Sequence, residues 1–337
     1  MKKVGLNTFV FESPPVMEDC FTIVGKKEGE GPLGIFFDKI IVDEYVGAKS
    51  WELAESKLLS LAIDELIKKI QIAKEEIEII VGGDLLNQLT ASHFAFRDLD
   101  NPFIGVYGAC STFALSTGLV AMFVESSSIR YAISATSSHF CSAEKQFRYP
   151  LEFGNQRTLT SQWTVTGAAA FLLKPNDGSK KPKITSYTVG KIMDFGIKDA
   201  NNMGAAMAPA AAFTISQHLS DMKRDLNYYD LVLTGDLGYV GRDLLIELLK
   251  EKEIKNAENL LDCGILIFDP IKQDTHAGGS GCAASACVFG GYIYKLMIEG
   301  TFKRILIAPT GALLSPTTVQ LGESIPVISH AISVEID

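Results

Sequence analysis

Residues 51–70 carry the clearest pattern of apolar and polar positions in the chain. Apolar residues from Leu58 to Ile70 return every three or four positions, with charged residues on the opposite face. Ser50, just before this stretch, is of a type that caps helices. The pattern predicts an amphipathic helix over 51–70. The short apolar run Ile77–Leu85, closed by glycines, predicts a buried strand after it.

A second helix and strand are predicted further along the first half. Segment Gly108–Ser128 opens with glycine and small polar residues and then becomes apolar on nearly all sides. A helix of this kind must be buried, because it has no polar face to turn to water. Arg130–Ser138 follows as a predicted strand.

The same order of elements returns in the second half. Pro209–Met222 predicts a helix with proline near its start. Three later segments mirror first-half ones: Leu231–Leu237 mirrors Ile79–Leu85, Gly278–Gly300 mirrors Gly108–Ser128, and Lys303–Ala312 mirrors Arg130–Ser138. The first pair is offset by about 152 residues and the later pairs by about 173. We therefore place an insertion of roughly 20 residues in the second half, around a helix at Arg242–Lys250 and a strand at Gly264–Phe268.

This alternation of strands and helices predicts an α/β fold with mixed, mainly parallel sheets covered on both faces. The two halves are expected at 1–175 and 176–337, packed as one compact unit. No linker-like stretch separates them. Lys174–Lys183, rich in proline, glycine and charge, is the best boundary candidate, although a surface hairpin would look the same.

Composition narrows the class of partner. The 337 residues are 47% hydrophobic and 21% charged, as in an ordinary globular protein, and the net charge is −9. Nucleic acid is not expected as a partner, because phosphate binding needs a basic face. Because the net charge is negative, an acidic ligand would need a site with local positive charge.

The six cysteines form no CxxC pair and no zinc spacing with the five histidines, so we expect reduced thiols and no metal. No signal peptide is visible, since only a few apolar residues separate Met1-Lys2-Lys3 from Glu12. No apolar run approaches the roughly 20 residues of a membrane span. Any association with a membrane is therefore expected to be peripheral.

Cys110 is the first candidate for chemistry. It lies in Gly108–Thr112, at the turn into the buried helix. A helix N-terminus favours a thiolate, and its N–H groups can hold a carboxylate or an oxyanion. The alternative is that Cys110 is a small core residue.

These features resemble the thiolase and ketoacyl synthase superfamily, which has a duplicated five-layer fold with a cysteine opening the central helix of the first half. Asp274–Ser285 resembles the second-half active-site loop of ketoacyl synthase III, best at its closing Ala-Ala-Ser. Enzymes of the superfamily need a histidine after the strand near Thr234 and an asparagine in the glycine-rich loop. Asp236 and Ser280, or their neighbours, stand at these places.

The absence of the histidine and the asparagine at these two places predicts that carbon–carbon condensation does not occur. An aspartate would repel the developing negative charge, and each lost donor costs on the order of 10²-fold or more in rate. Cys110 would then be a vestigial nucleophile. His276, close to the loop, either replaces one lost function or is a loop histidine bonded to backbone.

A closer resemblance is to the stage V sporulation protein AD family, and it covers nearly the whole chain. The segments that carry it are Lys27–Gly34, Phe37-Asp38, Lys49–Glu55, Gly82–Gln88, Tyr107–Thr112, Ser137–Pro150, Gly235–Gly238 and His276–Ser285. The resemblance implies a protein that binds dipicolinic acid where the enzymes have their active site. It also implies that the protein acts with membrane proteins of the same sporulation operon, which move dipicolinate into the forespore and out of the spore at germination. The protein would lie peripherally on the spore inner membrane. The resemblance implies no cofactor. Entry of the ligand as its calcium chelate stays open.

Dipicolinate is a flat dianion that needs cations, hydroxyls or N–H groups for its carboxylates and an apolar wall for its ring. The segment after a predicted strand end, from His139 to Arg157, offers such residues. The candidate ligand contacts are Cys110, Ser111, Thr112, His139, Arg148, Tyr149, Gln156, Arg157, Asp236, His276 and Ser280.

Two other functions stay open from the sequence alone. One is a Cys110-dependent acyl-thioester transferase of ketoacyl synthase type. The other is a structural subunit with an empty pocket. Because thiolase-like proteins commonly dimerise, we expect a homodimer.

Overall fold

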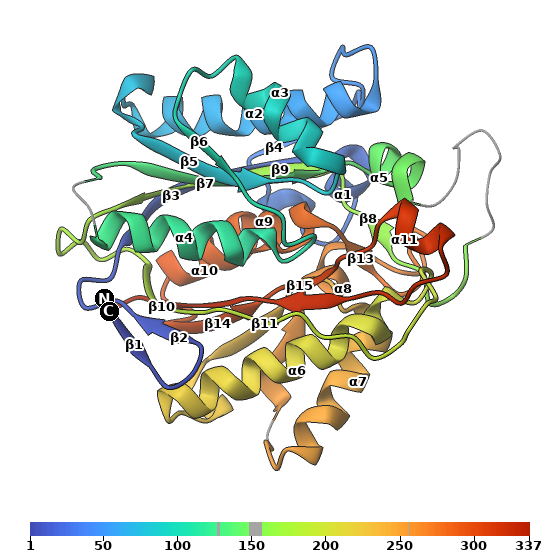
Figure 1. Ribbon diagram of the computed structural model, residues 1–337. Helices are drawn as coiled ribbons and strands as arrows, with labels where there is room; N and C mark the ends of the chain where they lie inside the picture. The colour runs from blue at the N-terminus through green and yellow to red at the C-terminus, as the bar shows by residue number, and fades with distance from the viewer. Residues whose placement is uncertain (127–128, 148–156, 256) are drawn as a thin grey trace.

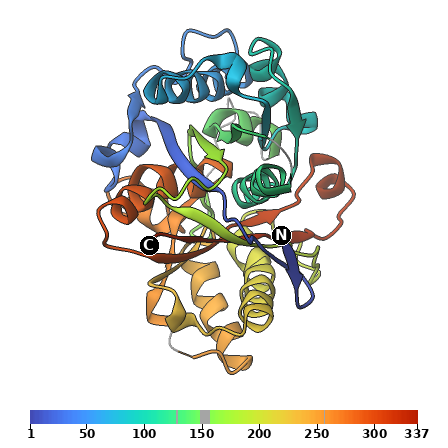
Figure 2. The ribbon, with the colours of Figure 1, turned by 90° about the vertical axis from the view of Figure 1, so that its left-hand side faces the viewer.

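The computed structural model describes residues 1–126, 129–147, 157–255 and 257–337, which form five alternating layers of helix and sheet (Figure 1). One outer layer holds α2 (Trp51–Ile70) and α3 (Thr90–Arg97), and the other holds α6 (Met203–Met222) and α7 (Gly238–Glu251). Between the sheets lie α4 (Thr112–Ser126), α9 (Cys282–Val288) and α10 (Tyr294–Ile298), as the end-on view in Figure 2 shows. The fold class is the predicted five-layer α/β arrangement.

The strands of the two sheets are hydrogen-bonded in one continuous order, β12-β11-β14-β17-β10-β3-β9-β7-β5-β6. The first-half strands are β3 (Val16–Gly25), β5 (Ile79–Gly83), β6 (Phe103–Gly105), β7 (Ala132–Ser138) and β9 (Gly167–Lys174). The second-half strands are β10 (Lys183–Thr188), β11 (Leu231–Thr234), β12 (Leu260–Asp262), β14 (Arg304–Ala308) and β17 (Ala331–Glu335). In each half the outer strands pair in parallel and the inner ones antiparallel. The halves meet at β10, which pairs with β3 through Lys183 and Val16 and with β2 (Thr8–Val10) through Ser186–Thr188.

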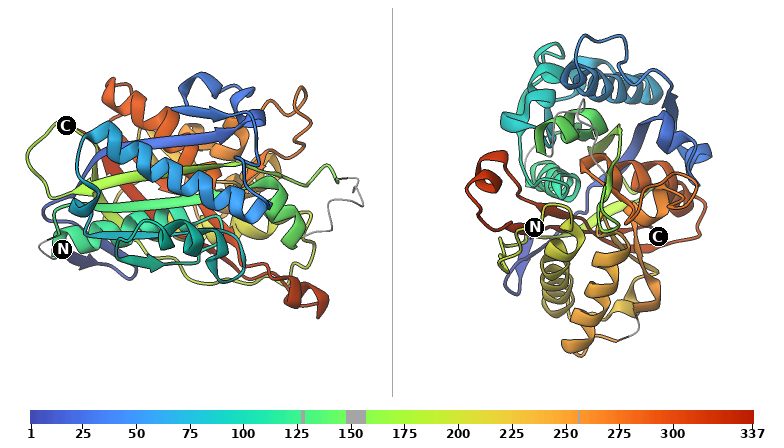
Figure 3. Two further views of the ribbon diagram at one scale, coloured as in Figure 1. Left: turned by 90° about the horizontal axis from the view of Figure 1, so that it is seen from above. Right: turned by 90° about the vertical axis from the view of Figure 1, so that its right-hand side faces the viewer.

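Helix α2 forms as its pattern predicts. The Ser50 hydroxyl accepts a 3.3 Å hydrogen bond from the Leu53 N–H, and Gln71 ends the helix in the left-handed conformation. The face that includes Leu58 and Leu66 is fully buried against the first sheet. Seen from above, the helix runs along that sheet (Figure 3).

Helix α6 begins at Met203, with the Asn202 side chain as its cap, so Pro209 lies inside it and not near its start. Proline normally breaks a helix, because it lacks an N–H and crowds the preceding turn. Here the small, buried residues around it, Ala206 to Ala212, hold the helix against the second sheet. Helices α2 and α6 each have 20 residues, and their first residues, Trp51 and Met203, lie 152 positions apart.

The expected strand at Gly264–Phe268 is instead helix α8 (Cys263–Ile267), and the strand of this region is β12. The Asp262 carboxylate accepts a 3.2 Å hydrogen bond from the Ile265 N–H and so caps α8. The capping aspartate is also the last residue of β12, so the strand ends two residues before Gly264, where the expected strand began.

Helix α4 is buried in the middle layer. Ala109–Ser126 is, among the described residues, the one helical stretch long and apolar enough to cross a bilayer, but 67% of it is buried inside the fold. Phe113 of α4 packs against Phe171 of β9 and against Phe289, with ring centroids 4.8 and 5.5 Å away. Its apolar surface is thus used for the core between the two sheets.

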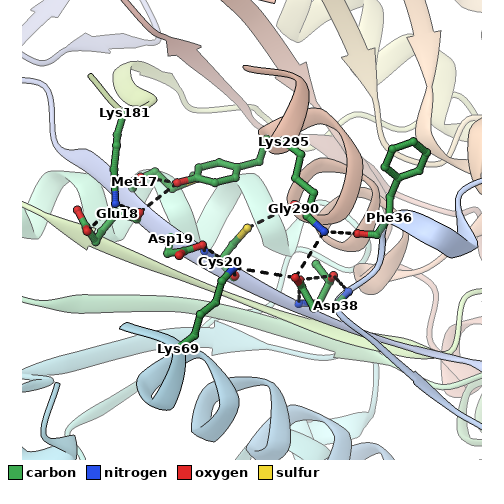
Figure 4. Close-up of polar contacts among 12 residues, drawn as sticks. Met17, Glu18, Asp19, Cys20, Phe36, Asp38, Lys69, Lys181, Gly290 and Lys295 are labelled. Atoms are coloured by element: carbon green, nitrogen blue, oxygen red, sulfur yellow. Dashed lines mark hydrogen bonds and ion pairs between the residues drawn. The ribbon is translucent and has the colours of Figure 1, made fainter. Parts of the chain in front are cut away.

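An ionic cluster ties the layers together along β3 (Figure 4). Asp38 accepts hydrogen bonds from the backbone N–H and the hydroxyl of Thr22, both at 2.9 Å. Its other oxygen lies 3.9 Å from Lys69 Nζ of α2 and 3.5 Å from Lys295 Nζ of α10. One carboxylate therefore joins an outer helix, a strand and a central helix.

Candidate functional site

Cys110 lies at the end of a short loop between edge strand β6 and central helix α4. Ala109, directly before it, is held in the left-handed region with φ 47°, which turns the chain into the helix. The Cys110 side chain forms part of a pocket of about 450 Å³, counting its open mouth. The pocket is lined by Leu85, Tyr107, Cys110, Ala143, Phe147, Thr164, Met203, Ser280, Ala312 and Leu314.

A buried carboxyl group lies behind this pocket. Asp236 follows β11 and is fully buried. Its Oδ2 accepts a 2.9 Å hydrogen bond from Ser280 Oγ, and its Oδ1 accepts one of 2.9 Å from Thr310 Oγ1. The Ser280 Oγ also lies 3.7 Å from the Cys110 sulfur. Burial raises the pKa of Asp236 to about 6, and the neighbouring Asp262 carboxylate adds to the rise.

Asp262 fixes the turn that carries Asp236. It accepts a 2.7 Å hydrogen bond from the Thr234 hydroxyl and bonds of 2.8 and 3.1 Å from the Leu237 and Gly238 N–H groups. On the other side of the turn, Gln162 Nε2 donates to the Asp236 and Gly279 carbonyls at 2.5 and 3.2 Å. These bonds hold Asp236 and the Ser280 strand in fixed relation.

The expectation that the helix start favours a Cys110 thiolate is not met. Burial raises the pKa of the Cys110 thiol well above its usual value, and the negative charge of Asp236 raises it further. The Ser111 and Thr112 hydroxyls donate to the Gly108 and Ala109 carbonyls at 2.6 Å, so both are bonded within the turn. Removal from water and a nearby carboxylate both disfavour the thiolate here.

Three of the predicted site residues come together at the pocket: Cys110, Asp236 and Ser280. Three others lie elsewhere. His139 is buried, accepts from the Cys141 N–H at 3.1 Å and lies 3.0 Å from the Glu44 carbonyl, and burial lowers its pKa. Arg157 and His276 both contact Asp274, at 2.8 and 3.0 Å.

The separation of Arg157 from the pocket follows from strand geometry. Strand β8 (Trp163–Thr164) pairs with β13 (Gly279–Ser280). Thr164 lines the pocket, whereas its neighbour Trp163 stacks on Phe140 with ring centroids 3.8 Å apart. Successive side chains of a strand face opposite ways. Since the Arg157 guanidinium lies 4.8 Å from the Trp163 ring, it belongs to the face turned away from Cys110.

Arg148, Tyr149 and Gln156 lie outside the described residues. Sequence reasoning missed several residues of the site. Thr310 holds Asp236, and Tyr107 and Thr164 line the pocket. Tyr107 directly precedes the Gly108–Thr112 turn and could have been included on that ground. Thr310 and Thr164 carry no signal in the sequence, because only the pairing of distant strands brings them to Asp236 and Ser280.

The described pocket is poor in charged donors. Among the described residues that line it there is no lysine, arginine or histidine. Within the same residues, no group of three or more His, Cys, Asp or Glu side chains is arranged to hold a metal ion. What the described part of the pocket offers a ligand is an apolar wall with a few hydroxyls, backed by Asp236.

The site can now be compared with known proteins. A family model of stage V sporulation protein AD (SpoVAD) matches residues 5–335. The chain belongs to the SpoVAD family. It is 43% identical over 335 residues to the stage V sporulation protein AD of Bacillus subtilis (strain 168), which covers 99% of this chain and 98% of the relative. The SpoVAD assignment makes it a sporulation protein.

Solved structures share this fold. A variant of OleA from Xanthomonas campestris matches with a TM-score of 0.56 and 14% identity over 99% of this chain and 100% of that one. The 3-oxoacyl-[acyl-carrier-protein] synthase III of Aquifex aeolicus VF5 matches with a TM-score of 0.55 and 11% identity over 95% and 99%. At these identities the likeness shows a shared thiolase-like fold and nothing about activity.

Proposed function

We propose that this SpoVAD family member is a non-catalytic binding protein for dipicolinic acid, acting in the uptake and release of dipicolinate by spores. The observation that carries the proposal is the Asp236–Ser280 pair beside Cys110. It lies at a pocket where the fold's enzymes have their active site, but supplies an acidic group where condensing chemistry needs a donor. The family match supports the spore context.

The geometry of the site disfavours acyl transfer. A nucleophilic cysteine needs its thiolate form, and burial beside Asp236 disfavours that form at Cys110. An acyl intermediate would also develop negative charge on its carbonyl oxygen. Asp236 behind the pocket would repel that charge instead of stabilising it.

A flat aromatic acid fits the lining of the pocket. Leu85, Phe147, Met203 and Leu314 supply the apolar wall for a ring. The hydroxyls of Tyr107 and Thr164 can donate to carboxylates, and the Ser280 hydroxyl, which donates its proton to the ionised Asp236, can do so when Asp236 is protonated. Because Asp236 lies behind Ser280, a dianion is best accommodated when the Asp236 carboxyl is protonated. Binding of dipicolinate is therefore coupled to proton uptake.

The wider setting of the protein belongs to the same proposal. We place it peripherally on the spore inner membrane, working with membrane proteins of the same sporulation operon and with no resident cofactor. We also propose a homodimer. Strand β6 ends the sheet, and its Ile104 is 38% exposed, which leaves an edge to pair with a second copy. Sedimentation of the purified protein as a monomer would contradict the dimer.

Equilibrium dialysis of dipicolinate against the purified protein tests the binding function. Saturable binding of one ligand per chain supports it, and no uptake at millimolar ligand contradicts it. The second candidate, a Cys110-dependent acyltransferase, rests on the position of Cys110 at the start of α4. Mass spectrometry after incubation with acyl-coenzyme A tests it, and an acyl adduct on Cys110 would favour it over the binding function.

A further inference from the structure

Two walls of the pocket come from different parts of the first half. One wall is the loop after β5, which contributes Leu85. The other is helix α5 (Phe140–Phe147), which contributes Ala143 and Phe147 from one helical face. The space available to a ligand depends on how these two walls are held relative to each other.

A single side chain joins the walls. Gln146 of α5 donates from Nε2 to the Leu85 carbonyl at 3.2 Å and accepts at Oε1 from the Asn87 N–H at 2.9 Å. Both bonds go to backbone, so they hold the loop whatever its side chains do. The amide is well suited to this place, because it offers one donor and one acceptor side by side.

The loop needs an outside partner to keep its shape. Gln88 and Leu89 are both in the left-handed region, with φ of 51° and 55°, which costs energy for residues with side chains. Asp84 fixes the residues on either side, accepting from the Leu86 N–H at 2.8 Å and from the Ser92 N–H at 2.8 Å. Gln146 contacts the Leu85 carbonyl and the Asn87 N–H from outside the loop, while Thr90 donates to the Asn87 carbonyl at 2.7 Å from its C-terminal side.

Helix α5 is itself fixed on the outer layer, so it can serve as the anchor. Ser142 donates to Glu55 of α2 at 2.6 Å, and Lys145 pairs with Glu52 of α2 at 2.7 Å. Ser142 and Gln146 lie four residues apart on one helical face. That face therefore joins α2 through Ser142 and the pocket loop through Gln146.

We infer that Gln146 is a positioning residue that clamps the Leu85–Leu89 loop to α5 and so sets the width of the pocket and the residence time of its ligand. The part of this inference that concerns the ligand rests on the proposed dipicolinate function. The part that concerns the loop is independent of that function, because Gln146 holds the loop in the protein without a ligand.

Hydrogen exchange and binding kinetics separate the two parts. In Gln146→Ala, the Asn87 amide is expected to exchange about tenfold faster, since one hydrogen bond of ordinary strength is lost. Dipicolinate is expected to dissociate faster by a similar factor, with a smaller change in its association rate. Gln146→Glu keeps the acceptor for Asn87 but turns a carboxylate oxygen towards the Leu85 carbonyl, so it should show the faster dissociation with less change at Asn87.

Lys250→Ala is the control, because it breaks an exposed 2.7 Å ion pair with Glu247 on α7, in the opposite outer layer. Unchanged Asn87 exchange in Gln146→Ala would overturn the clamp, and so would equal effects in Lys250→Ala. Faster exchange with unchanged dissociation would overturn the role in ligand residence. If the wild-type protein binds no dipicolinate, the proposed function fails, and the exchange of Asn87 still decides whether Gln146 clamps the loop.

Discussion

Ser280 donates a 2.9 Å hydrogen bond to Asp236 and stands 3.7 Å from the sulfur of Cys110, so one hydroxyl links an acidic group to a cysteine inside the same pocket. Both groups are buried, and the Asp236 carboxylate disfavours the thiolate of Cys110, whereas the hydrogen bond from Cys110 lowers the pKa of Asp236 that burial raises. Cys110 is thus held as a neutral thiol beside a carboxyl group, which disfavours nucleophilic chemistry. Several measurable properties depend on this relationship.

Replacing Asp236 should change how stability depends on pH. Folding raises the pKa of Asp236 from 3.8 to about 6, so the native state holds a proton that the unfolded state releases. The contribution of Asp236 to stability therefore falls as pH rises from about 4 to about 6, by about 3 kcal/mol. Asp236→Asn should lack this loss and be the more stable protein at neutral pH. Urea unfolding at about pH 4 and pH 7.5 measures the difference.

Asp243→Asn is the control for that experiment, because Asp243 is an exposed aspartate of α7, with a side chain 77% exposed. It should leave the pH dependence of wild-type stability in place. If Asp236→Asn loses as much stability as the wild type between these two pH values, burial of the ionised Asp236 carboxylate does not destabilise the protein.

Cys110 should react slowly with alkylating agents. Its thiol pKa is raised by burial and by Asp236, so little thiolate is present at neutral pH. Cys141, which is partly exposed and has a pKa raised to about 11, is the internal reference. Peptide mass spectrometry after iodoacetamide treatment should find Cys141 labelled first, and Asp236→Asn should speed labelling of Cys110. Labelling of Cys110 ahead of Cys141 would show that the helix start activates it after all.

The ionic cluster around Asp38 should matter for stability rather than for binding. Asp38→Ala removes the acceptor for the Thr22 N–H and hydroxyl and leaves Lys69 and Lys295 without this carboxylate (Figure 4). A loss of about 2–3 kcal/mol is expected, as for a partly buried, charge-assisted set of bonds. Lys26→Ala, which breaks the exposed pair with Glu30 at 3.8 Å, should cost little. Equal losses in the two variants would mean that the cluster does not join the layers.

Dipicolinate affinity should rise as pH falls. A bound dianion favours the protonated form of Asp236, so affinity should strengthen by up to about tenfold per pH unit as pH falls towards 6. Asp236→Asn should remove that slope. Dissociation constants measured at several values between about pH 5 and pH 8 test it, and equal slopes in both proteins would place the ligand away from Asp236.

The sequence predicted the parts of the fold that depend on local pattern. Helix α2 has the predicted bounds, because its cap, its period and its buried face all agree. Helix α6 was placed six residues too late, since its first turns are small apolar residues without a polar face and Pro209 suggested a start. Packing against the second sheet determines where that helix begins, and a local sequence pattern does not show this packing.

The site was predictable only in part for a related reason. The resemblance to known loops pointed to Cys110, Asp236 and Ser280, and the structure brings these together. Arg157 and His276 have suitable side chains but face Asp274, because the β8–β13 pairing turns Trp163 and Thr164 to opposite sides. Which side of a two-residue strand faces the pocket cannot be read from residue types.

Calorimetric titration of the purified protein with dipicolinate tests the central claim most directly, with pyridine-2-carboxylate as the control ligand. We predict saturable binding that needs both carboxylates and that weakens in Ser280→Ala and Cys110→Ala, with the variants folded as judged by circular dichroism. Absence of binding, or equal binding of the two ligands unaffected by either substitution, would contradict a dipicolinate site in the Cys110–Asp236 pocket.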